Sequence, residues 1–346
     1  MKKSLIALAV LAASGAAMAQ SSVTLFGIVD TGVGYVSNGG SENGLNTAGQ
    51  SKNGMTTSGN ATSRLGFRGV EDLGGNLKAG FWLEGQIDGD DGNATGFNFK
   101  RRSTISLMGN FGEVRLGREL TAGYGKPSSY DPFGQVGLGH FAAFSVSRVG
   151  NAVSYSTPGN LGGLFAMVHY GFGEQADNTS AGSYFGINGG YENGPLSVTL
   201  AADQLKNVNP ALEALKTWSL GASYDLGMVK PAFIYHAEKV GAVKTNSYML
   251  ALTAPVGPGK LIGSYARYDL KNSNQDSDAL SVGYVYDLSK RTAVYGTYAY
   301  MKNKNGANRN LGAVSGSFSG VTAANNAAFV NGENVNGFQV GIRHSF

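Results

Sequence analysis

Apolar and polar residues alternate along many segments of this chain, which is the pattern of extended strands with one apolar and one polar face. The alternation is clearest in four segments, 196–203, 217–224, 247–254 and 280–286. In the second of them, Trp218 and Tyr224 stand at the two ends of the apolar face, as two aromatic girdles at membrane interfaces require. Segments 259–268 and 292–301 are also strand-like, but the sequence does not choose their outer face.

The final segment follows the same rule and ends on an aromatic side chain. Apolar residues at 338, 340, 342 and 346 alternate with glycine or polar residues. The closing strand of a membrane β-barrel needs an outer face for lipid, an inner face for water and an aromatic ring at the interface. The pattern therefore predicts such a strand.

The connections between the expected strands alternate in length. Short turns are expected near 73–76, 110–112, 159–163, 193–195, 226–228, 256–259 and 287–290. Long polar connections are expected near 36–58, 88–98, 119–147, 171–182, 205–215, 239–244, 270–277 and 302–335. Seven short and eight long connections join sixteen strands. A barrel of sixteen strands is too wide for its own side chains to fill, so it encloses a water channel.

A β-sandwich or a soluble β-solenoid would also alternate. A sandwich, however, packs valine, leucine and isoleucine from both sheets into one shared core. Here the faces opposite the apolar ones consist of serine, threonine and glycine throughout. We therefore expect an all-β protein, a transmembrane antiparallel β-barrel with a polar lumen.

The first nineteen residues have the three parts of a secretory signal peptide: two lysines, an apolar run at 5–13 and a small-x-small end at 17–19. The apolar run is too short to cross a bilayer as a helix. A buried N-terminal helix is the alternative. We expect residues 1–19 to be the signal peptide and residues 20–346 to be the barrel.

Composition agrees with a β-protein that has many turns. Charged residues make up 14% of the chain, while it contains 53 glycines, 17 phenylalanines and 17 tyrosines. The formal net charge is only +4 and no basic run is present, so no nucleic-acid partner is expected. The chain has no cysteine, which excludes disulfides and thiolate metal sites. No cofactor is expected.

Five segments, in this order, resemble the trimeric sixteen-stranded general porins of Gram-negative outer membranes, of the β-proteobacterial type. They are a first strand at 22–30, a strand and its turn at 63–74, a strand at 111–118, a late turn at 286–291, and the terminal Phe346. The resemblance covers the whole chain after the leader. It implies that the third outer loop, about 119–147, folds into the barrel and narrows the pore.

The resemblance also implies a group of arginines on the wall that faces this loop. Arg64, Arg118 and Arg148 match the family's arginines by motif. Alternation gives an independent indication for Arg64, Arg68 and Arg102. Nearby apolar residues on the same strands must face lipid, so these three arginines face the lumen, where a charge costs little. Charges in a confined aqueous passage are less screened than on an open surface, so we expect a weak to moderate preference for anions.

The acidic side of the expected constriction is weaker. The run from Pro132 to Gly134 resembles the family's Pro-Glu-Phe-Gly turn, but Pro132 stands where the family has its glutamate. Asp131 is then the nearest acid, and Glu119 opens the loop.

The resemblance implies passive diffusion of small hydrophilic solutes and inorganic ions, without catalysis. It also implies a homotrimer in the outer membrane, reached through the periplasm, in contact with outer-membrane lipids and lipopolysaccharide. The outer-membrane assembly machinery would then read Phe346 as a terminal signal.

Other classes of function remain open. An outer-membrane hydrolase needs a serine with a histidine and an acid, for which His169 with Ser154 or Ser156 are candidates that no motif links. An adhesin or structural barrel would have a plugged lumen. The acidic run at 88–93 crudely suggests a calcium loop, but it lacks the downstream glutamate at proper spacing, which favours a hydrated loop.

Overall fold

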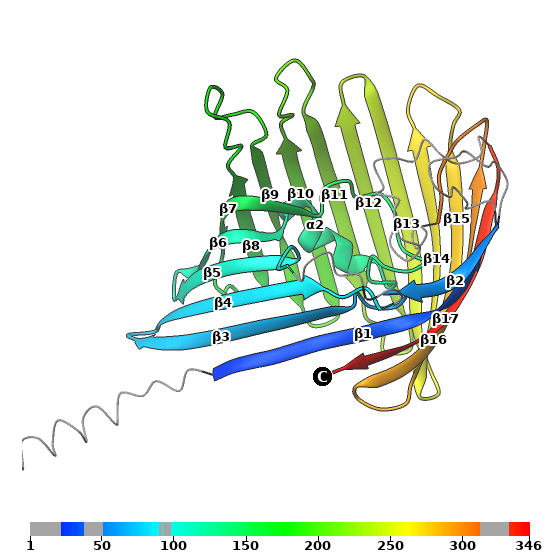
Figure 1. Ribbon diagram of the computed structural model, residues 1–346, viewed down its shortest axis with the longest axis horizontal. Helices are drawn as coiled ribbons and strands as arrows, with labels where there is room; N and C mark the ends of the chain where they lie inside the picture. The colour runs from blue at the N-terminus through cyan, green and yellow to red at the C-terminus, as the bar shows by residue number, and fades with distance from the viewer. Residues whose placement is uncertain (1–21, 38–50, 90–91, 93–97, 312–331) are drawn as a thin grey trace, which may run out of the picture.

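The computed structural model describes residues 22–37, 51–89, 92, 98–311 and 332–346, and the expected signal peptide at 1–19 lies outside them. The described residues form strands, a short helix α2 (Ala122–Gly125) and a 3-10 helix η1 (Pro127–Tyr130) (Figure 1). The strands are β1 (Ser22–Val36), β2 (Lys52–Thr57), β3 (Arg64–Gly74), β4 (Leu77–Gln86), β5 (Arg102–Gly109), β6 (Gly112–Leu120), β7 (Arg148–Ser156), β8 (Leu164–Gly171), β9 (Tyr184–Asn193), β10 (Leu196–Leu205), β11 (Leu215–Tyr224), β12 (Lys230–Val240), β13 (Val243–Val256), β14 (Gly259–Leu270), β15 (Ser277–Asp287), β16 (Thr292–Asn303) and β17 (Val335–Ser345).

Within the described part of the chain, these strands close into one antiparallel barrel of sixteen strands. β1 closes the ring by pairing with β17, with Ile28 opposite Ser345. Along its other edge, β1 pairs with β3 over residues 22–28 and with β2 over residues 31–36. β2 and β3 are therefore two parts of a single barrel strand, and the segment 36–58, expected to be a long polar connection, contains β2.

The seven short turns are confirmed, and most of the other connections are longer. The prediction of a long connection at 239–244 is wrong, because β12 ends at Val240 and β13 begins at Val243. Gly241 has a φ of +57°, the left-handed conformation that a two-residue hairpin turn needs and that glycine adopts without strain. In the described part of the chain, no helix is both long and apolar enough to span a bilayer.

Large apolar side chains cover the outside of the barrel, as the alternation predicted. Leu250 and Ile105 are each 60% exposed, which suits a wall in contact with lipid. Exposed aromatic rings include Trp218 in the first half of β11 and Tyr224 at its end. The sequence left the outer face of segment 259–268 undecided. In β14, which contains this segment, Tyr265 lies on the exposed outer face and the buried side chains lie on the inner face.

The inner face is more apolar than the sequence predicted. Buried, inward-facing residues that depart from serine, threonine and glycine are Ile234, Met249, Ile262, Tyr268 and Val285. They pack against Phe133 and Phe141 of the segment between β6 and β7. A wall that touches a protein segment excludes water there, and the alternation of one strand does not reveal such a distant partner.

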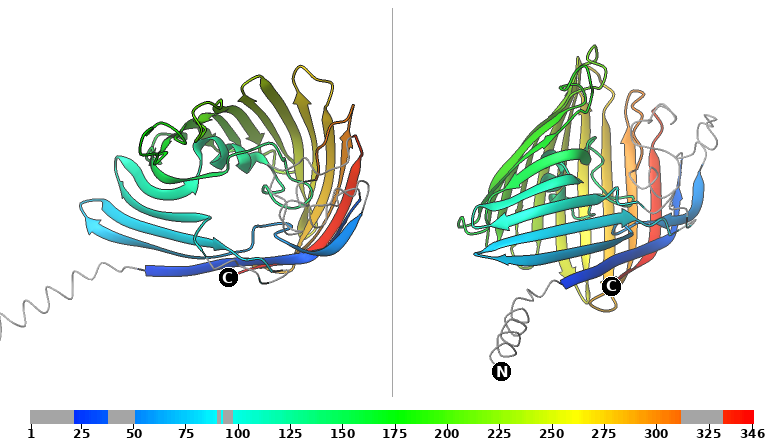
Figure 2. Two further views of the ribbon diagram at one scale, coloured as in Figure 1. Left: turned by 45° about the horizontal axis from the view of Figure 1, so that its top comes forward. Right: turned by 60° about the vertical axis from the view of Figure 1, so that its left-hand side comes forward.

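Residues 121–147, between β6 and β7, fold into the barrel and carry α2 and η1 (Figures 1 and 2), which confirms the expected inward loop. We call them the constriction loop. The loop begins and ends on paired positions, because the Thr121 N–H donates to the Ser147 carbonyl over 3.0 Å. Its first half lies against the barrel wall at β10, where the Tyr130 hydroxyl is 2.8 Å from Ser197 Oγ. The space that remains between the loop and the rest of the wall is a narrowed passage.

The terminal Phe346 lies against the first strand. Its N–H donates to the Gly27 carbonyl, and its carbonyl accepts from the Gly27 N–H, both over 3.1 Å. A Cβ atom at Gly27 would come within 2.3 Å of the Phe346 ring, so only glycine admits the ring there. The last residue therefore helps to join the two ends of the barrel, while its role as an assembly signal stays a prediction.

The break between β2 and β3 is organised by the buried carboxylate of Asp30. It accepts the backbone N–H groups of Gly59, Asn60 and Ala61 at 3.3, 2.8 and 2.6 Å. The Tyr295 hydroxyl also donates to it, over 2.6 Å. The break is therefore a defined turn, after which the chain enters β3 at Arg64.

We expect Asp30→Ala to destabilise the barrel by at least about 3 kcal/mol, because each buried donor left without an acceptor costs about 1–3 kcal/mol. Guanidinium unfolding of the detergent-solubilised protein measures this change. Asp30→Asn keeps one carbonyl oxygen and should lose less. A free energy of unfolding for Asp30→Ala equal to that of the wild type would contradict the prediction.

Candidate functional site

Two recesses meet beside the constriction loop. The inner recess has a volume of about 520 Å³ and extends toward the short turns, and the outer recess extends toward the longer connections. Arg64, Arg101 and Arg148 line both recesses, and so does Gly125 of the loop. The passage between the recesses therefore runs between these three arginines, which we call the arginine cluster, and α2.

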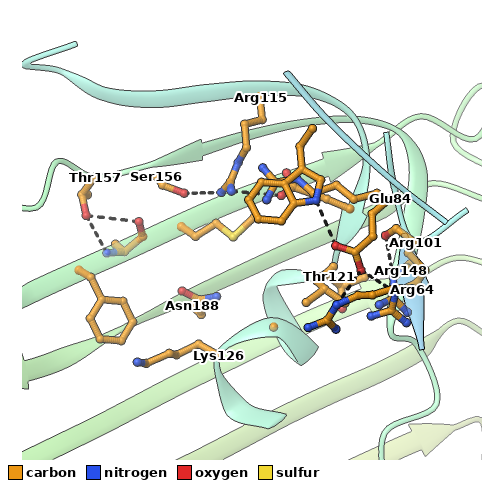
Figure 3. Close-up of a pocket in the computed structure, with 18 residues that line it drawn as sticks. Arg64, Glu84, Arg101, Arg115, Thr121, Lys126, Arg148, Ser156, Thr157 and Asn188 are labelled. Carbon is orange, nitrogen blue, oxygen red and sulfur yellow. Dashed lines mark hydrogen bonds and ion pairs between the residues drawn. The ribbon is translucent and has the colours of Figure 1, made fainter. Parts of the chain in front are cut away.

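A single carboxylate faces two members of the arginine cluster (Figure 3). Arg101 Nε lies 2.6 Å from Glu84 Oε1, and Arg64 Nε lies 3.9 Å from the same oxygen. The Trp82 indole N–H donates to the other oxygen, Oε2, over 3.1 Å. One negative charge thus serves two guanidinium groups, and a surplus of positive charge remains.

Other arginines are held by neutral groups. Arg148 donates from Nε to the Arg101 carbonyl over 2.8 Å, and Arg118 donates from Nε to the Lys100 carbonyl over 2.6 Å. Arg118 lines a third recess, shared with Arg148 and Lys100, and lies outside the inner and outer recesses. Carbonyl acceptors fix a guanidinium group in place without cancelling its charge.

Arg68 and Arg102 both lie against Trp82 on the inner face. Their guanidinium carbons are 5.1 Å and 4.6 Å from the ring centroid, within the range of a cation–π contact. Arg102 also donates to Thr104 Oγ1 over 3.0 Å and lines the inner recess. Arg68 supports the ring from outside that recess.

The two acidic candidates are engaged in other contacts. Glu119 Oε2 is 3.3 Å from Arg115 Nη1, and Glu119 Oε1 accepts from Ser154 Oγ over 2.5 Å. The Asp131 carboxylate accepts three backbone N–H groups of the constriction loop, among them those of Phe133 and Phe141. Burial raises the pKa of the Asp131 carboxyl, and the nearby His140 and these N–H donors oppose the rise. Asp131 therefore organises the loop.

Of the residues predicted from the sequence, four line the inner recess: Arg64, Arg102, Arg148 and Glu119. The sequence analysis missed other charged residues of this recess. Those are Glu84, Arg101, Arg115 and Lys126. Arg115 carried a usable signal, because the neighbouring Leu116 is an outward, exposed residue that turns Arg115 inward. Arg101 precedes the start of β5 and Lys126 lies on the loop, so alternation says nothing about either.

The serine and histidine candidates do not form a catalytic group. Ser154 and His169 are opposite each other in the β7–β8 pairing, but Ser154 Oγ donates to Glu119 instead. A second arrangement joins Ser219 Oγ to His236 Nδ1 over 2.8 Å and His236 Nε2 to Glu238 over 2.9 Å. Ser219 is fully buried, so its hydroxyl is closed to a solute.

Within the described residues, no group of three or more histidine, aspartate or glutamate side chains is placed to hold a metal ion. The acidic run at 88–93 lies partly outside the described residues.

The far end of the constriction loop is fastened by Tyr268. The Ala142 N–H donates to the Tyr268 hydroxyl over 3.0 Å. The Phe141 ring stacks on Tyr268 with centroids 5.7 Å apart, and the Arg309 guanidinium carbon lies 4.4 Å from the ring centroid. Tyr268 is therefore the point where β14, the loop and the last outer connection meet.

We expect Tyr268→Phe to loosen this end of the loop, because the partly buried Ala142 N–H loses its acceptor. Single-channel recordings should show open-state current noise that is severalfold above that of the wild type. Tyr265→Phe is the matched control, since Tyr265 lies on the outer face of the same strand and its hydroxyl donates to Asp278. Equal noise in the two variants would contradict this role of Tyr268.

Comparison with known proteins gives a consistent result. The family model described as "Gram-negative porin" matches residues 5–306. The chain is 50% identical over 370 residues to outer membrane porin protein 32 of Delftia acidovorans, with 100% of each chain covered. It is 34% identical over 367 residues to an outer membrane porin protein of Bordetella pertussis, with 88% of this chain and 95% of the relative covered.

Solved structures agree with the fold. A structure described as an anion-selective porin from Comamonas acidovorans matches with a TM-score of 0.84 and 46% identity, over 94% of this chain and 100% of that one. A structure of OmpT of Vibrio cholerae, described as a trimer form, matches with a TM-score of 0.64 and 13% identity, over 94% of this chain and 99% of that one. At that identity the second match concerns the fold alone.

Proposed function

Because the chain belongs to the Gram-negative porin family of outer-membrane proteins, we propose that it forms a water-filled channel that passes small hydrophilic anions more readily than cations. Passage is by diffusion down a gradient. The constriction loop sets the size limit, and the arginine cluster sets the preference for charge. Its similarity to a porin described as anion-selective supports this proposal.

One observation carries the charge preference: six basic and two acidic side chains line the inner recess. Neutral groups hold two of the basic ones, Arg102 and Arg148, and Lys126 Nζ lies 2.6 Å from Glu192 Oε2, so a surplus of positive charge still acts on the passage. Water in a narrow passage screens these charges less than bulk solvent does, which favours the entry of anions.

Reversal-potential measurements in planar bilayers test the proposal. With a tenfold KCl gradient, the sign of the potential should correspond to chloride passing more easily than potassium. The preference should weaken as salt rises, since the Debye length falls from about 10 Å at 0.1 M to about 3 Å at 1 M. A potential of zero, or one with the sign of a cation channel, would refute it.

The remaining assignments rest on the family. We propose a homotrimer surrounded by outer-membrane lipids and lipopolysaccharide, inserted by the assembly machinery that reads Phe346, with a leader cleaved after residue 19. We also propose that the chain catalyses no reaction, which is supported by the burial of Ser154 and Ser219. Chemical cross-linking of the purified protein, with three subunits expected, tests the assembly.

A further inference from the structure

We propose that the inner recess binds organic monoanions with an apolar body, such as aryl or cycloalkyl carboxylates, more tightly than small hydrophilic anions such as acetate. This inference rests on the proposed anion preference and adds a ligand class to it. It follows from a combination that a simple charge filter does not need: apolar side chains standing beside the arginine cluster in the lumen.

The apolar part of the recess comes from neighbouring inner-face positions. Phe165 and Met167 of β8 are two residues apart and share the inner face, and both line the recess together with Trp82 of β4. All three side chains are only partly buried. Serine or threonine would keep a water channel wetted at no cost, so apolar surface here favours a ligand that covers it.

The charged part lies next to this surface. Figure 3 shows Arg64, Arg101 and Arg148 on one side of the recess and Lys126 and Asn188 on the other. Guanidinium groups bind carboxylates through paired hydrogen bonds, which gives the anion a fixed orientation. A carboxylate at the arginine cluster therefore directs its body into the recess.

Contacts between cations and rings keep charge and apolar surface together. Lys126 Nζ lies 5.3 Å from the centroid of Phe165, and the Arg102 guanidinium carbon lies 4.6 Å from that of Trp82. Size also agrees, because a cavity of about 150 Å³ holds benzene and the recess has about 520 Å³. An aromatic acid thus fits with room for its hydration water.

Block of chloride current by carboxylates tests the proposal in planar bilayers. The half-blocking concentration of benzoate and of cyclohexanecarboxylate should lie at least about tenfold below that of acetate, the lower range for one methylene group in an apolar pocket. In the double variant Phe165→Ser/Met167→Ser, the ratio of benzoate to acetate should approach one. Phe172→Ser, which changes an exposed apolar side chain on the connection after β8, should keep the wild-type ratio.

A second readout does not depend on current. The chain has two tryptophans, so Trp218→Phe on the lipid-facing wall leaves Trp82 as the only fluorophore of its kind. Benzoate should change the fluorescence of this variant at lower concentration than acetate does.

Equal block by benzoate and acetate in the wild type, or a double variant with the wild-type ratio, would overturn the inference. The reversal potential in KCl should be the same in the double variant and the wild type, because no charge is removed. A wild type without anion preference would refute the proposed function instead, so the two failures are distinguishable.

Discussion

Replacing Arg64, Arg101 and Arg148 together by serine should abolish the preference for anions. All three line both recesses, so a passing ion meets each of them. A guanidinium group about 6 Å from an anion contributes about 3 kcal/mol at an effective dielectric constant of about 20. Because 1.4 kcal/mol corresponds to tenfold, the permeability ratio of chloride to potassium should fall by at least about tenfold. Glu84 then loses both of its arginine partners, and its unpaired charge should lower the preference for anions further.

The matched control removes the same charge elsewhere. Lys290 and Arg291 are exposed on the turn between β15 and β16, and Lys244 is exposed near the start of β13 at the other rim of the barrel. Their combined replacement by serine should leave the reversal potential near that of the wild type. Arg118→Ser alone should have a smaller effect than any member of the arginine cluster, since Arg118 lies in a separate recess. A cluster variant with the wild-type reversal potential would show that selectivity arises elsewhere.

The strands and most of their connections could be predicted because each depends on local sequence. Alternation fixes which face meets lipid, and glycine-rich turns mark the short rim. The failure at 239–244 has a local cause as well. Lysine and valine at the ends of that segment were counted as loop, although Lys239 and Lys244 pair across the hairpin. Where two strands extend beyond the bilayer, their ends carry polar residues. The sequence of such strand ends with a two-residue turn then resembles that of a polar loop.

Contacts between distant segments could not be predicted. Met249 and Val285 occupy inner-face positions that alternation assigns to water, but the constriction loop covers them. Asp131 is an acid in the loop and was therefore expected to line the pore, yet its carboxylate accepts hydrogen bonds from three backbone N–H groups of the loop. Arg101 was not predicted because it stands one residue before β5 begins, so the alternation of the strand does not include it. Each case depends on a partner that is remote in sequence or on the exact end of a strand.

The second large effect concerns the size of the pore. Thr121 and Ser147 are hydrogen-bonded neighbours at the base of the constriction loop, so Asn-Gly can replace residues 122–146 as a hairpin turn. This variant keeps the arginine cluster, which belongs to the wall. Single-channel conductance should rise severalfold, and larger sugars should pass in liposome-swelling measurements, because sixteen strands alone leave a wide channel. Thermal stability should fall, since Ile262, Met249 and Tyr268 would become exposed to water.

A matched loop replacement separates the constriction from a general effect on the barrel. Leu205 and Leu215 pair at the base of another outer connection, so Asn-Gly can also replace residues 206–214, most of which are exposed. That variant should keep the wild-type conductance. If shortening the constriction loop left conductance and the sugar limit unchanged, the narrowest point would lie elsewhere in the lumen. Some anion preference should persist in the widened channel at low salt and vanish at high salt, because the arginines remain but act across more water.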